Sequence, residues 1–575
     1  MSNTNPPEGP QGVHGPEYLE QGGGAPVRPA RTGGSRKPAL IAGGAIAGLL
    51  LVGGGIWAAT WYLGTGAQPA EALPASTLGY VSIDLDPSGA QKIEAVKTLN
   101  KFPAFKDKLD LSTTDDVRKK IFEEIQGTGA CPDLDYGDDI EPWLGDRAAL
   151  AAVDTGADQP SPVFVVQVKD ADKADAGLKK IQDCNDSSDS TDGAEPSGGW
   201  AINGDWAVIA ETDKIAQGVV DDAEKSSLSD DADYQKWTDA VGDPGIVSMY
   251  AAPEAGDYLA KNLADMTGMF GGSASSIASS CTVEPNADPG TVPTCGDTGT
   301  VTSESNTPMP SQLADALKDF KGMAATIRFN DGALELEAAG DPGVSQKNLY
   351  AGDQGDDVVA TLPADTAAAI GVGFRDGWFT DFVDQMASYS GGRTTAAQLM
   401  SQMAQASGLD LPADAETLAG DSVAVSVGSD FDPETIFGSG DPSSIPVAAK
   451  VKGDPEAING VLDKVRGQMG TEESSVLQSD SEGDMIAIGP DSDYRSQVLK
   501  GGTLGDSPVF SDVVREADKA TALFYVNFDA GDGWLTKLAA DNQEAVDNLE
   551  PLEGLGISAW QEDGTAHTVV RLTTN

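Results

Sequence analysis

One long uncharged stretch, residues 39–63, constrains this chain more than any other feature. A helix of that length measures about 37 Å, and the hydrocarbon core of a bilayer is about 30 Å thick. Because a helix satisfies its own backbone N–H and C=O groups, it can cross lipid without a partner helix. The sequence therefore predicts a single transmembrane helix over residues 39–63, with the lipid bilayer as its partner.

The flanks of this stretch predict its orientation. Arg36 and Lys37 precede it, whereas Trp57, Trp61 and Tyr62 lie at its exit end. Basic residues favour the cytoplasmic side of a membrane, and aromatic rings favour the headgroup layer. We therefore expect a cytoplasmic N-terminus, five interface anchors at these positions, and a body that lies outside the cell membrane.

Two further interpretations of the stretch stay open. Residues 70–72 resemble a cleavage site, so a cleaved signal peptide is the alternative, although the apolar run is long for one. Gly44 and Gly48 form a GxxxG pair, which allows two helices to approach closely in lipid. A homodimer through these glycines is the corresponding prediction, and chance in a Gly-rich segment is the competing one.

The strongly acidic composition of the chain limits which classes of molecule it can bind. The chain has 37 basic and 91 acidic residues, a net charge of −54. Nucleic-acid binding depends on neutralised phosphates, so this balance excludes it. It also argues against adsorption to anionic lipid. Solubility is the plainest role of the charge.

The four cysteines predict an oxidising compartment, because disulfides persist outside the cytoplasm. Four cysteines allow three pairings. We favour Cys281–Cys295, which closes a short loop, and Cys131–Cys184 then follows by elimination. The spacings lack the paired CxxC of zinc sites.

The remainder of the chain repeats itself. Residues 73–77 recur at 362–366, residues 164–169 match 447–452, and Asp-Gly turns at 331–332 and 563–564 close the two copies. Asp-Gly favours the positive φ of a tight hairpin turn. The predicted organisation is a disordered cytoplasmic tail (1–38), the span (39–63), a linker (64–72), lobe 1 with cysteine-bearing insertions (73–342), a linker (343–357) and lobe 2 (358–575).

Each copy alternates short strands with short helices that begin at Asp-Pro, as at 86–87 and 454–455. Asp caps the free N–H groups of a helix, and Pro suits its first turn. Adjacent strands joined by short turns favour antiparallel pairing. We therefore predict an α+β fold: a single N-terminal transmembrane helix, then an ectodomain of two tandem repeat lobes, each a largely antiparallel sheet with helices on one face.

Several of these features together resemble a known family. They are the Pro/Gly-rich tail, the span behind Arg36-Lys37, the opening at 73–75 with residues 80–86, and the turn at 144–147. This combination resembles actinobacterial single-pass membrane-anchored proteins of a domain-of-unknown-function family. The resemblance implies an extracytoplasmic ectodomain of uncharacterised role, and it supplies no catalytic motif.

No motif for catalysis or cofactor binding is present. The sequence lacks GxSxG, GxxxxGK[ST] and GxGxxG, and His567 is the one histidine after the predicted span. Residues 84–89 begin like a calcium loop, but Ala95 stands where its glutamate is needed. The acidic loop 183–199 is interpreted as solvated, and the tryptophans as core anchors. We predict no catalytic, cofactor-binding or metal-ligating residue.

Three functions remain. The first is a non-enzymatic binding or scaffolding ectodomain at the cell envelope. The second is a protein that holds a small molecule or lipid in a cleft in or between the lobes. The third is an envelope hydrolase that uses paired carboxylates, which the many acidic residues leave open.

Overall fold

The structure is a computed structural model that describes residues 68–84, 90–109, 115–127, 131–188, 198–261, 317–343, 358–389, 394–431, 442–470, 473–531, 533–540 and 542–575. The predicted tail, the span 39–63, its five anchors and the pair Gly44 and Gly48 all lie outside these residues. Within the part of the chain that is described, no helix is both long and apolar enough to cross a membrane.

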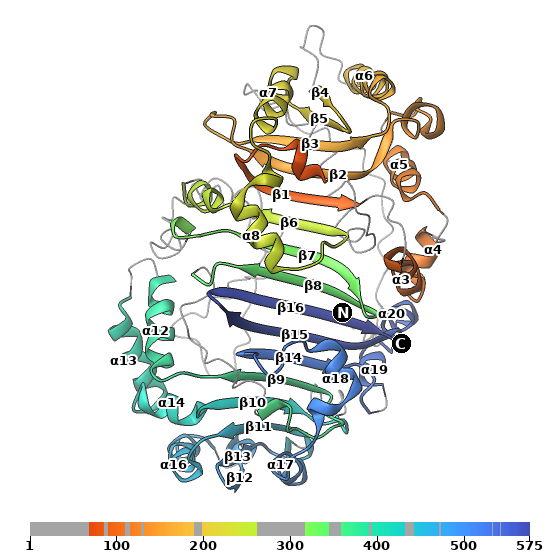
Figure 1. Ribbon diagram of the computed structural model, residues 1–575. Helices are drawn as coiled ribbons and strands as arrows, with labels where there is room; N and C mark the ends of the chain where they lie inside the picture. The colour runs from red at the N-terminus through yellow and green to blue at the C-terminus, as the bar shows by residue number, and fades with distance from the viewer. Residues whose placement is uncertain are drawn as a thin grey trace, which may run out of the picture. The chain divides into compact units, whose positions relative to one another are not determined.

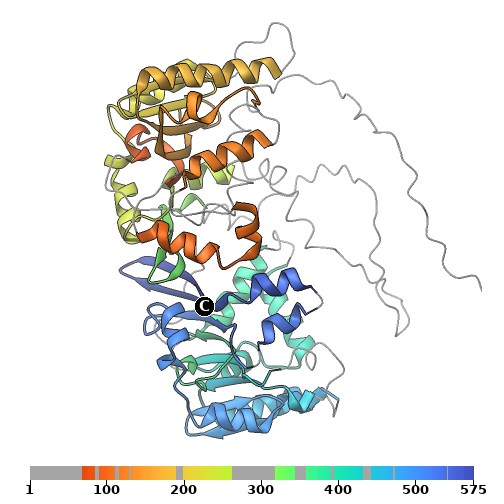
Figure 2. The same ribbon diagram turned by 90° about the vertical axis from the view of Figure 1, so that its right-hand side faces the viewer.

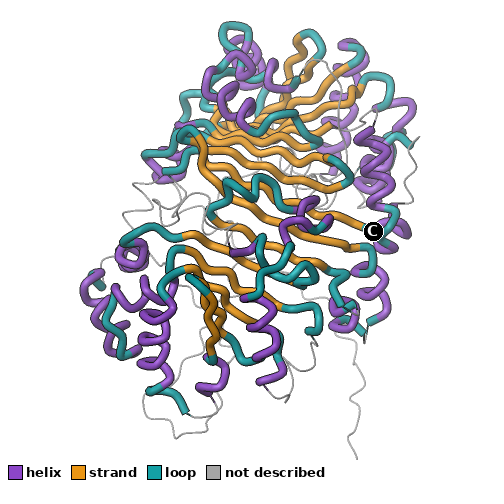
Figure 3. Tube along the Cα trace, turned by 60° about the horizontal axis from the view of Figure 1, so that its bottom comes forward, coloured by secondary structure: helices purple, strands orange, loops and turns teal. Residues whose placement is uncertain are grey.

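The strands form one 16-stranded sheet, in the order β12-β13-β11-β10-β9-β14-β15-β16-β8-β7-β6-β1-β2-β3-β5-β4 (Figures 1 and 3). The first eight strands are β1 (Thr77–Asp84), β2 (Leu144–Val153), β3 (Ser161–Val168), β4 (Gly199–Asn203), β5 (Trp206–Ala210), β6 (Val247–Ala251), β7 (Met323–Asn330) and β8 (Ala333–Gly340). The second eight are β9 (Ala368–Gly373), β10 (Ser422–Val427), β11 (Val447–Lys452), β12 (Ser479–Glu482), β13 (Met485–Ile488), β14 (Ala522–Asn527), β15 (Leu552–Glu562) and β16 (Thr565–Thr574).

The prediction of two lobes with separate sheets is wrong. Strands β8 and β16 pair antiparallel, from Leu334 opposite Leu572 to Gly340 opposite Ala566, and so join the two sets of strands into one sheet. Each of these strands would otherwise be an edge with unpaired N–H and C=O groups, and pairing the two edges satisfies both.

The two halves of the sheet have equivalent strand orders when each is read from its outer edge toward the centre. From its outer edge inward, the first half runs β4-β5-β3-β2-β1-β6-β7-β8, and the second runs β12-β13-β11-β10-β9-β14-β15-β16. We call the pairing of β8 with β16 the seam. Glu337 and Val569 each lie six residues after the Asp of their hairpin turn, and they pair with each other across the seam. Because equivalent residues pair with each other there, the backbone of the seam has an approximate two-fold symmetry.

The two predicted Asp-Gly hairpins are confirmed. Asp331 and Asp563 have φ angles of 51° and 49°, and the glycines that follow have 78° and 80°. Asn330 pairs with Ala333, and Glu562 pairs with Thr565, so each loop has two residues. Positive φ at both loop positions is the geometry whose twist matches the flanking strands.

Helices cover both faces of the sheet, so the prediction of helices on one face is also wrong. Ala148 and Ala149 are neighbours on β2 and point to opposite faces. Ala149 packs in a core with α7 and α8, whereas Ala148 packs in a core with α6. We call these sides the α7 face and the α6 face. The helices of the first half are α3 (Ala90–Leu99), α4 (Pro103–Leu109), α5 (Val117–Gly127), α6 (Ala171–Ser188), α7 (Asp213–Ala223) and α8 (Ala232–Ala240).

The second half follows the same plan. Ala424 on β10 packs in a core with α17 and α18, and its neighbour Val423 packs against α16 on the other face. The helices of this half are α12 (Trp378–Tyr389), α13 (Ala396–Ser407), α14 (Ala413–Ala419), α16 (Pro455–Arg466), α17 (Ser492–Leu499), α18 (Pro508–Val513), α19 (Trp534–Leu538) and α20 (Gln543–Leu549). Helix α20 contacts α4 of the first half, where the backbone N–H of Ala104 donates to Asn548 Oδ1 at 3.0 Å (Figure 2).

The predicted Asp-Pro start of a helix is confirmed at α16. The Asp454 side chain accepts hydrogen bonds from the N–H groups of Glu456 and Ala457, and Pro455 takes the first helical position. The corresponding pair at 86–87 lies outside the described residues. The domain boundaries given above stay a prediction.

Candidate functional site

A hollow lies on the α6 face, where four central strands of the first half present apolar side chains. Its volume is about 580 Å³. We call it the trough. Its lining consists of Gly79, Tyr80, Val81, Leu150, Ala151, Ala152, Pro160, Pro162, Met249, Tyr250, Ala251, Met323, Ala324 and Ala325.

Strand alternation explains why the trough floor is apolar. Val81 lies on the α6 face and pairs with Leu150 on one side and Met249 on the other. Met249 in turn pairs with Ala325. Directly paired residues point to the same face of a sheet, so these four side chains form one row. This part of the α6 face is therefore apolar, because alternate residues of each strand point to it.

The opposite side of the same strands is well packed. Tyr80 is buried on the α7 face, and Tyr234 of α8 lies edge-on to Tyr80 and Tyr250, with ring centroids 5.9 and 5.1 Å away. Burial raises the pKa of Tyr234 to about 12 and raises that of Tyr80 as well. These hydroxyl groups stay neutral near pH 7, and the floor of the trough rests on a rigid aromatic layer.

Among the described residues, helices cover the α6 face at one end of these strands and leave it exposed at the other. Ala95 and Val96 of α3 and Val117 of α5 pack with Val247 and Phe329 in one buried cluster. Toward the trough, by contrast, Val81 is 38% exposed and Met323 is 40% exposed. Large aliphatic side chains are thus left accessible beside a covered part of the same face.

The chemistry of the trough is that of apolar contact. None of its lining residues carries a carboxylate, an imidazole, a thiol, an amine or a guanidinium group. Its polar side-chain groups are the hydroxyls of Tyr80 and Tyr250, and both rings belong to the α7 face. The lining therefore favours an uncharged, apolar occupant and offers no group for proton transfer or nucleophilic attack.

A second hollow, of about 370 Å³, lies where α19 and α20 meet the ends of β14 and β15. Its lining is mixed and includes two carboxylates, those of Asp529 and Glu550. Its remaining lining residues are Phe528, Gly533, Leu535, Thr536, Gln543, Val546, Leu549 and Leu552.

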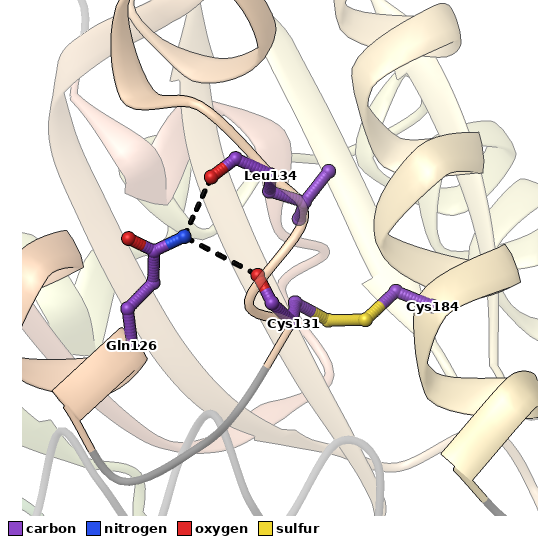
Figure 4. Close-up of a disulfide and its surroundings, with 4 residues drawn as sticks. All are labelled: Gln126, Cys131, Leu134 and Cys184. Atoms are coloured by element: carbon purple, nitrogen blue, oxygen red, sulfur yellow. Dashed lines mark hydrogen bonds between the residues drawn. A yellow bond between two sulfur atoms is a disulfide. The ribbon is translucent and has the colours of Figure 1, made fainter.

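The structure pairs Cys131 with Cys184, with a Cα–Cα distance of 5.7 Å (Figure 4). Cys184 belongs to α6, and Cys131 lies in the segment that follows α5. Gln126 of α5 donates hydrogen bonds to the backbone O of Cys131 and of Leu134, at 3.2 and 2.5 Å. The disulfide therefore fixes the connection between α5 and α6. Cys281 and Cys295 lie outside the described residues.

The acidic loop predicted at 183–199 begins as helix, because α6 continues to Ser188. Asp84, the first residue of the calcium-like pattern, is buried and pairs with Arg147 at 3.5 Å. Among the described residues, no group of three or more His, Cys, Asp or Glu side chains could hold a metal ion.

His567 stacks on Trp560 across β15 and β16, with ring centroids 5.1 Å apart. Burial lowers its pKa, and its Nδ1 atom has no hydrogen-bond partner within the described structure. A base that lacks an orienting partner is poorly placed for catalysis. The prediction that tryptophans anchor the core holds for Trp143, Trp206, Trp237 and Trp560, which are buried, whereas Trp200, Trp378 and Trp534 are only half-buried.

Sequence reasoning missed a buried ionic cluster at the seam. Glu335 of β8 pairs with Arg571 of β16, and both side chains are almost fully buried. Arg328 of β7 pairs with Glu335 at 2.6 Å and also with Glu337. The signal in the sequence was Glu at alternate positions, 335 and 337, in a strand where an apolar side chain would be expected.

The trough was also missed. Its signal was the run of small and apolar residues at 148–153, in β2. Which part of such a face a helix leaves open depends on the tertiary structure.

Comparisons with known proteins give a family and no function. No curated protein and no solved structure matches the chain. A family model described as a protein of unknown function (DUF3352) matches residues 44–438, about two thirds of the chain. That match covers all of β1 to β8 and extends into the second half as far as β10. The chain therefore belongs to the DUF3352 family of proteins of unknown function.

Proposed function

We propose that this chain is a non-enzymatic binding protein that works outside the cytoplasm and holds a small apolar or lipidic ligand in the trough. The observation that carries the proposal is the trough itself, a hollow of about 580 Å³ with an uncharged lining in a chain whose net charge is −54. Sites for small ligands typically measure about 300–1,000 Å³.

Burial of apolar surface supplies the affinity. Each CH₂ group removed from water contributes about 0.8 kcal/mol. Val81 and Met323 provide accessible aliphatic surface, and Gly79 and the alanines let a ligand approach the backbone closely. An uncharged ligand also avoids the repulsion that an anion would meet near so acidic a protein.

Two observations support the compartment and the absence of catalysis in this proposal. The disulfide between Cys131 and Cys184 favours an oxidising environment. The lining of the trough provides apolar surface that a ligand can contact, but it contains no acid, base or nucleophile. Binding or scaffolding at the envelope is consistent with such a site, whereas a carboxylate hydrolase would need acids around it.

The test uses the full chain and Nile red, an uncharged dye whose fluorescence rises in an apolar site. Val81→Asp places a carboxylate in the centre of the trough, where an apolar ligand would have to desolvate it. We expect this variant to weaken dye binding at the trough at least about tenfold, which corresponds to about 1.4 kcal/mol.

The matched control is Val476→Asp. Val476 lies in η5 (Glu473–Leu477), away from the trough, and its exposure of 36% is close to the 38% of Val81. We expect it to bind dye as the unmodified chain does. Equal dye binding by the Val81→Asp and Val476→Asp variants would contradict the proposed function.

A further inference from the structure

The approximate symmetry of the sheet gives the trough a counterpart in the second half. In the first half, Val81 of β1 pairs with Leu150 of β2 and Met249 of β6. In the second half, Ile370 of β9 pairs with Val425 of β10 and Phe524 of β14. When each half is read from its outer edge inward, β9, β10 and β14 take the same positions as β1, β2 and β6. Ile370 is therefore the equivalent of Val81.

These residues also lie on the same face as the trough. The row of the trough continues from Ala325 to Ala338 and Thr568 across the seam. Val570, two residues after Thr568 and therefore on the same face, pairs with Ile557. Ile557 pairs with Phe524, whose other partner is Ile370. The α6 face is therefore shared by both groups of side chains.

The counterpart is exposed and apolar. Ile370 is 48% exposed and Val425 is 42% exposed, more than Val81 or Met323. We call this group the second-half patch; it consists of Ala368, Ile370, Val425, Val427, Phe524 and Ile557, and none of these side chains is charged or polar.

Exposed aliphatic side chains scattered singly over a surface need no explanation, but groups of them do. Eight large hydrophobic residues of the described chain are exposed, and four of them (Val81, Met323, Ile370 and Val425) fall in these two equivalent places. A patch without charge, on a chain with a net charge of −54, complements a neutral apolar molecule and not a cation or a basic protein surface.

We propose that the second-half patch is a second binding site for the same class of ligand, so that one chain takes two equivalents of a neutral apolar ligand. The inference rests on the proposed function of the trough. It adds a site, a stoichiometry and a specific set of residues: Ile370 and Val425 would contact the ligand as Val81 and Leu150 do in the trough.

The test measures how many Nile red molecules bind per full-length chain. We expect two for the unmodified chain and for Val476→Asp, one for Val81→Asp, one for Ile370→Asp, and none for the double variant. Circular dichroism and thermal unfolding show whether each variant is folded, and Val425→Asp replaces Ile370→Asp if the latter is not.

The outcomes separate the two proposals. A stoichiometry of one that Val81→Asp abolishes and Ile370→Asp leaves unchanged would overturn the second site and keep the trough. A stoichiometry that neither variant changes would overturn both. If Ile370→Asp instead dissociates a dimer in sedimentation and leaves dye binding unchanged, the patch is a contact between copies and the second site is wrong.

Discussion

At the scale of single residues, the second half contains a buried lysine that has no acidic partner among the described residues. Lys450 of β11 is 3% exposed on the α7 face, and its Nζ donates to the backbone O and to Oγ1 of Thr361, at 3.1 and 2.8 Å. Burial lowers its pKa to about 8. The folded protein thus favours the neutral amine far more than an unfolded chain does.

The sign of the effect on stability follows from this shift. Between about pH 8 and the unfolded pKa of about 10.4, the unfolded chain binds more protons at this site than the folded protein, so this contribution to stability rises with pH. Below pH 8 both states are protonated, and the cost of burying the charge is constant.

We therefore predict that the free energy of unfolding of the unmodified chain, relative to Lys450→Met, increases by roughly 1–3 kcal/mol from pH 8 to pH 10.5. Urea titrations across that range measure it. The control is Lys500→Met, at the exposed C-cap of α17. A constant difference between the unmodified chain and Lys450→Met across the range would refute the assignment.

The ionic cluster at the seam belongs to the same scale. Burial by itself would raise the pKa of Glu335, but Arg328 and Arg571 outweigh it and hold that pKa below its usual value. The Arg571 guanidinium also donates to the backbone O of Asp512 and of Asn330, at 2.7 and 3.1 Å. Glu335 is thus the charged partner of a buried cation.

We predict that Glu335→Leu destabilises the fold by about 3–5 kcal/mol, because it leaves the Arg571 charge buried without its carboxylate. The double variant Glu335→Leu/Arg571→Met should recover most of that loss, since neither charge is then buried. Denaturant unfolding of the two variants tests this. A double variant as unstable as the sum of both single changes would show that the two charges are not coupled, and would contradict this prediction.

At the scale of elements, local signals predicted local structure well. The Asp-Gly pairs predicted both hairpins because few other residues adopt the required positive φ. Asp454-Pro455 predicted the start of α16 because capping depends on residues within one turn. Short turns between adjacent strands predicted antiparallel pairing. Such signals are read from a few neighbouring positions, so the sequence carries them directly.

The pairing of β8 with β16 could not be predicted in that way. Alternation tells which side chains of a strand face the core, but it does not tell which strand lies beside its edge. The prediction of helices on one face failed for a related reason: Ala148 and Ala149 are neighbours on β2 and both are buried, one in each core, and side chains this small do not indicate which helix lies over them.

The disulfide fixes the connection between α5 and α6 by closing a large loop. Its cysteines are 53 residues apart, for which the loop-entropy relation gives about 4 kcal/mol of stabilisation. We predict that Cys131→Ser/Cys184→Ser lowers the free energy of unfolding by about 2–4 kcal/mol. Chemical denaturation of the non-reduced protein tests this, with the Cys281→Ser/Cys295→Ser variant as the comparison. A loss below about 0.5 kcal/mol would show that the bond adds little to the fold.

At the scale of the whole molecule, one sheet carries two related halves whose α6 face shows apolar side chains in two equivalent places. The repeat was visible in the sequence, but the trough was not. Its exposure depends on how much of the α6 face is covered by α3 and α5. The functional argument rests on the trough.

The most direct test of that claim is photo-crosslinking of the full chain with a neutral long-chain alcohol that carries a diazirine, followed by peptide mapping. The account predicts labelled peptides from β1, β6 and β7, centred on Val81, Met249 and Met323, and competition by the unlabelled alcohol. Labelling spread over the surface without competition, or labelling absent from β1, β6 and β7, would contradict it.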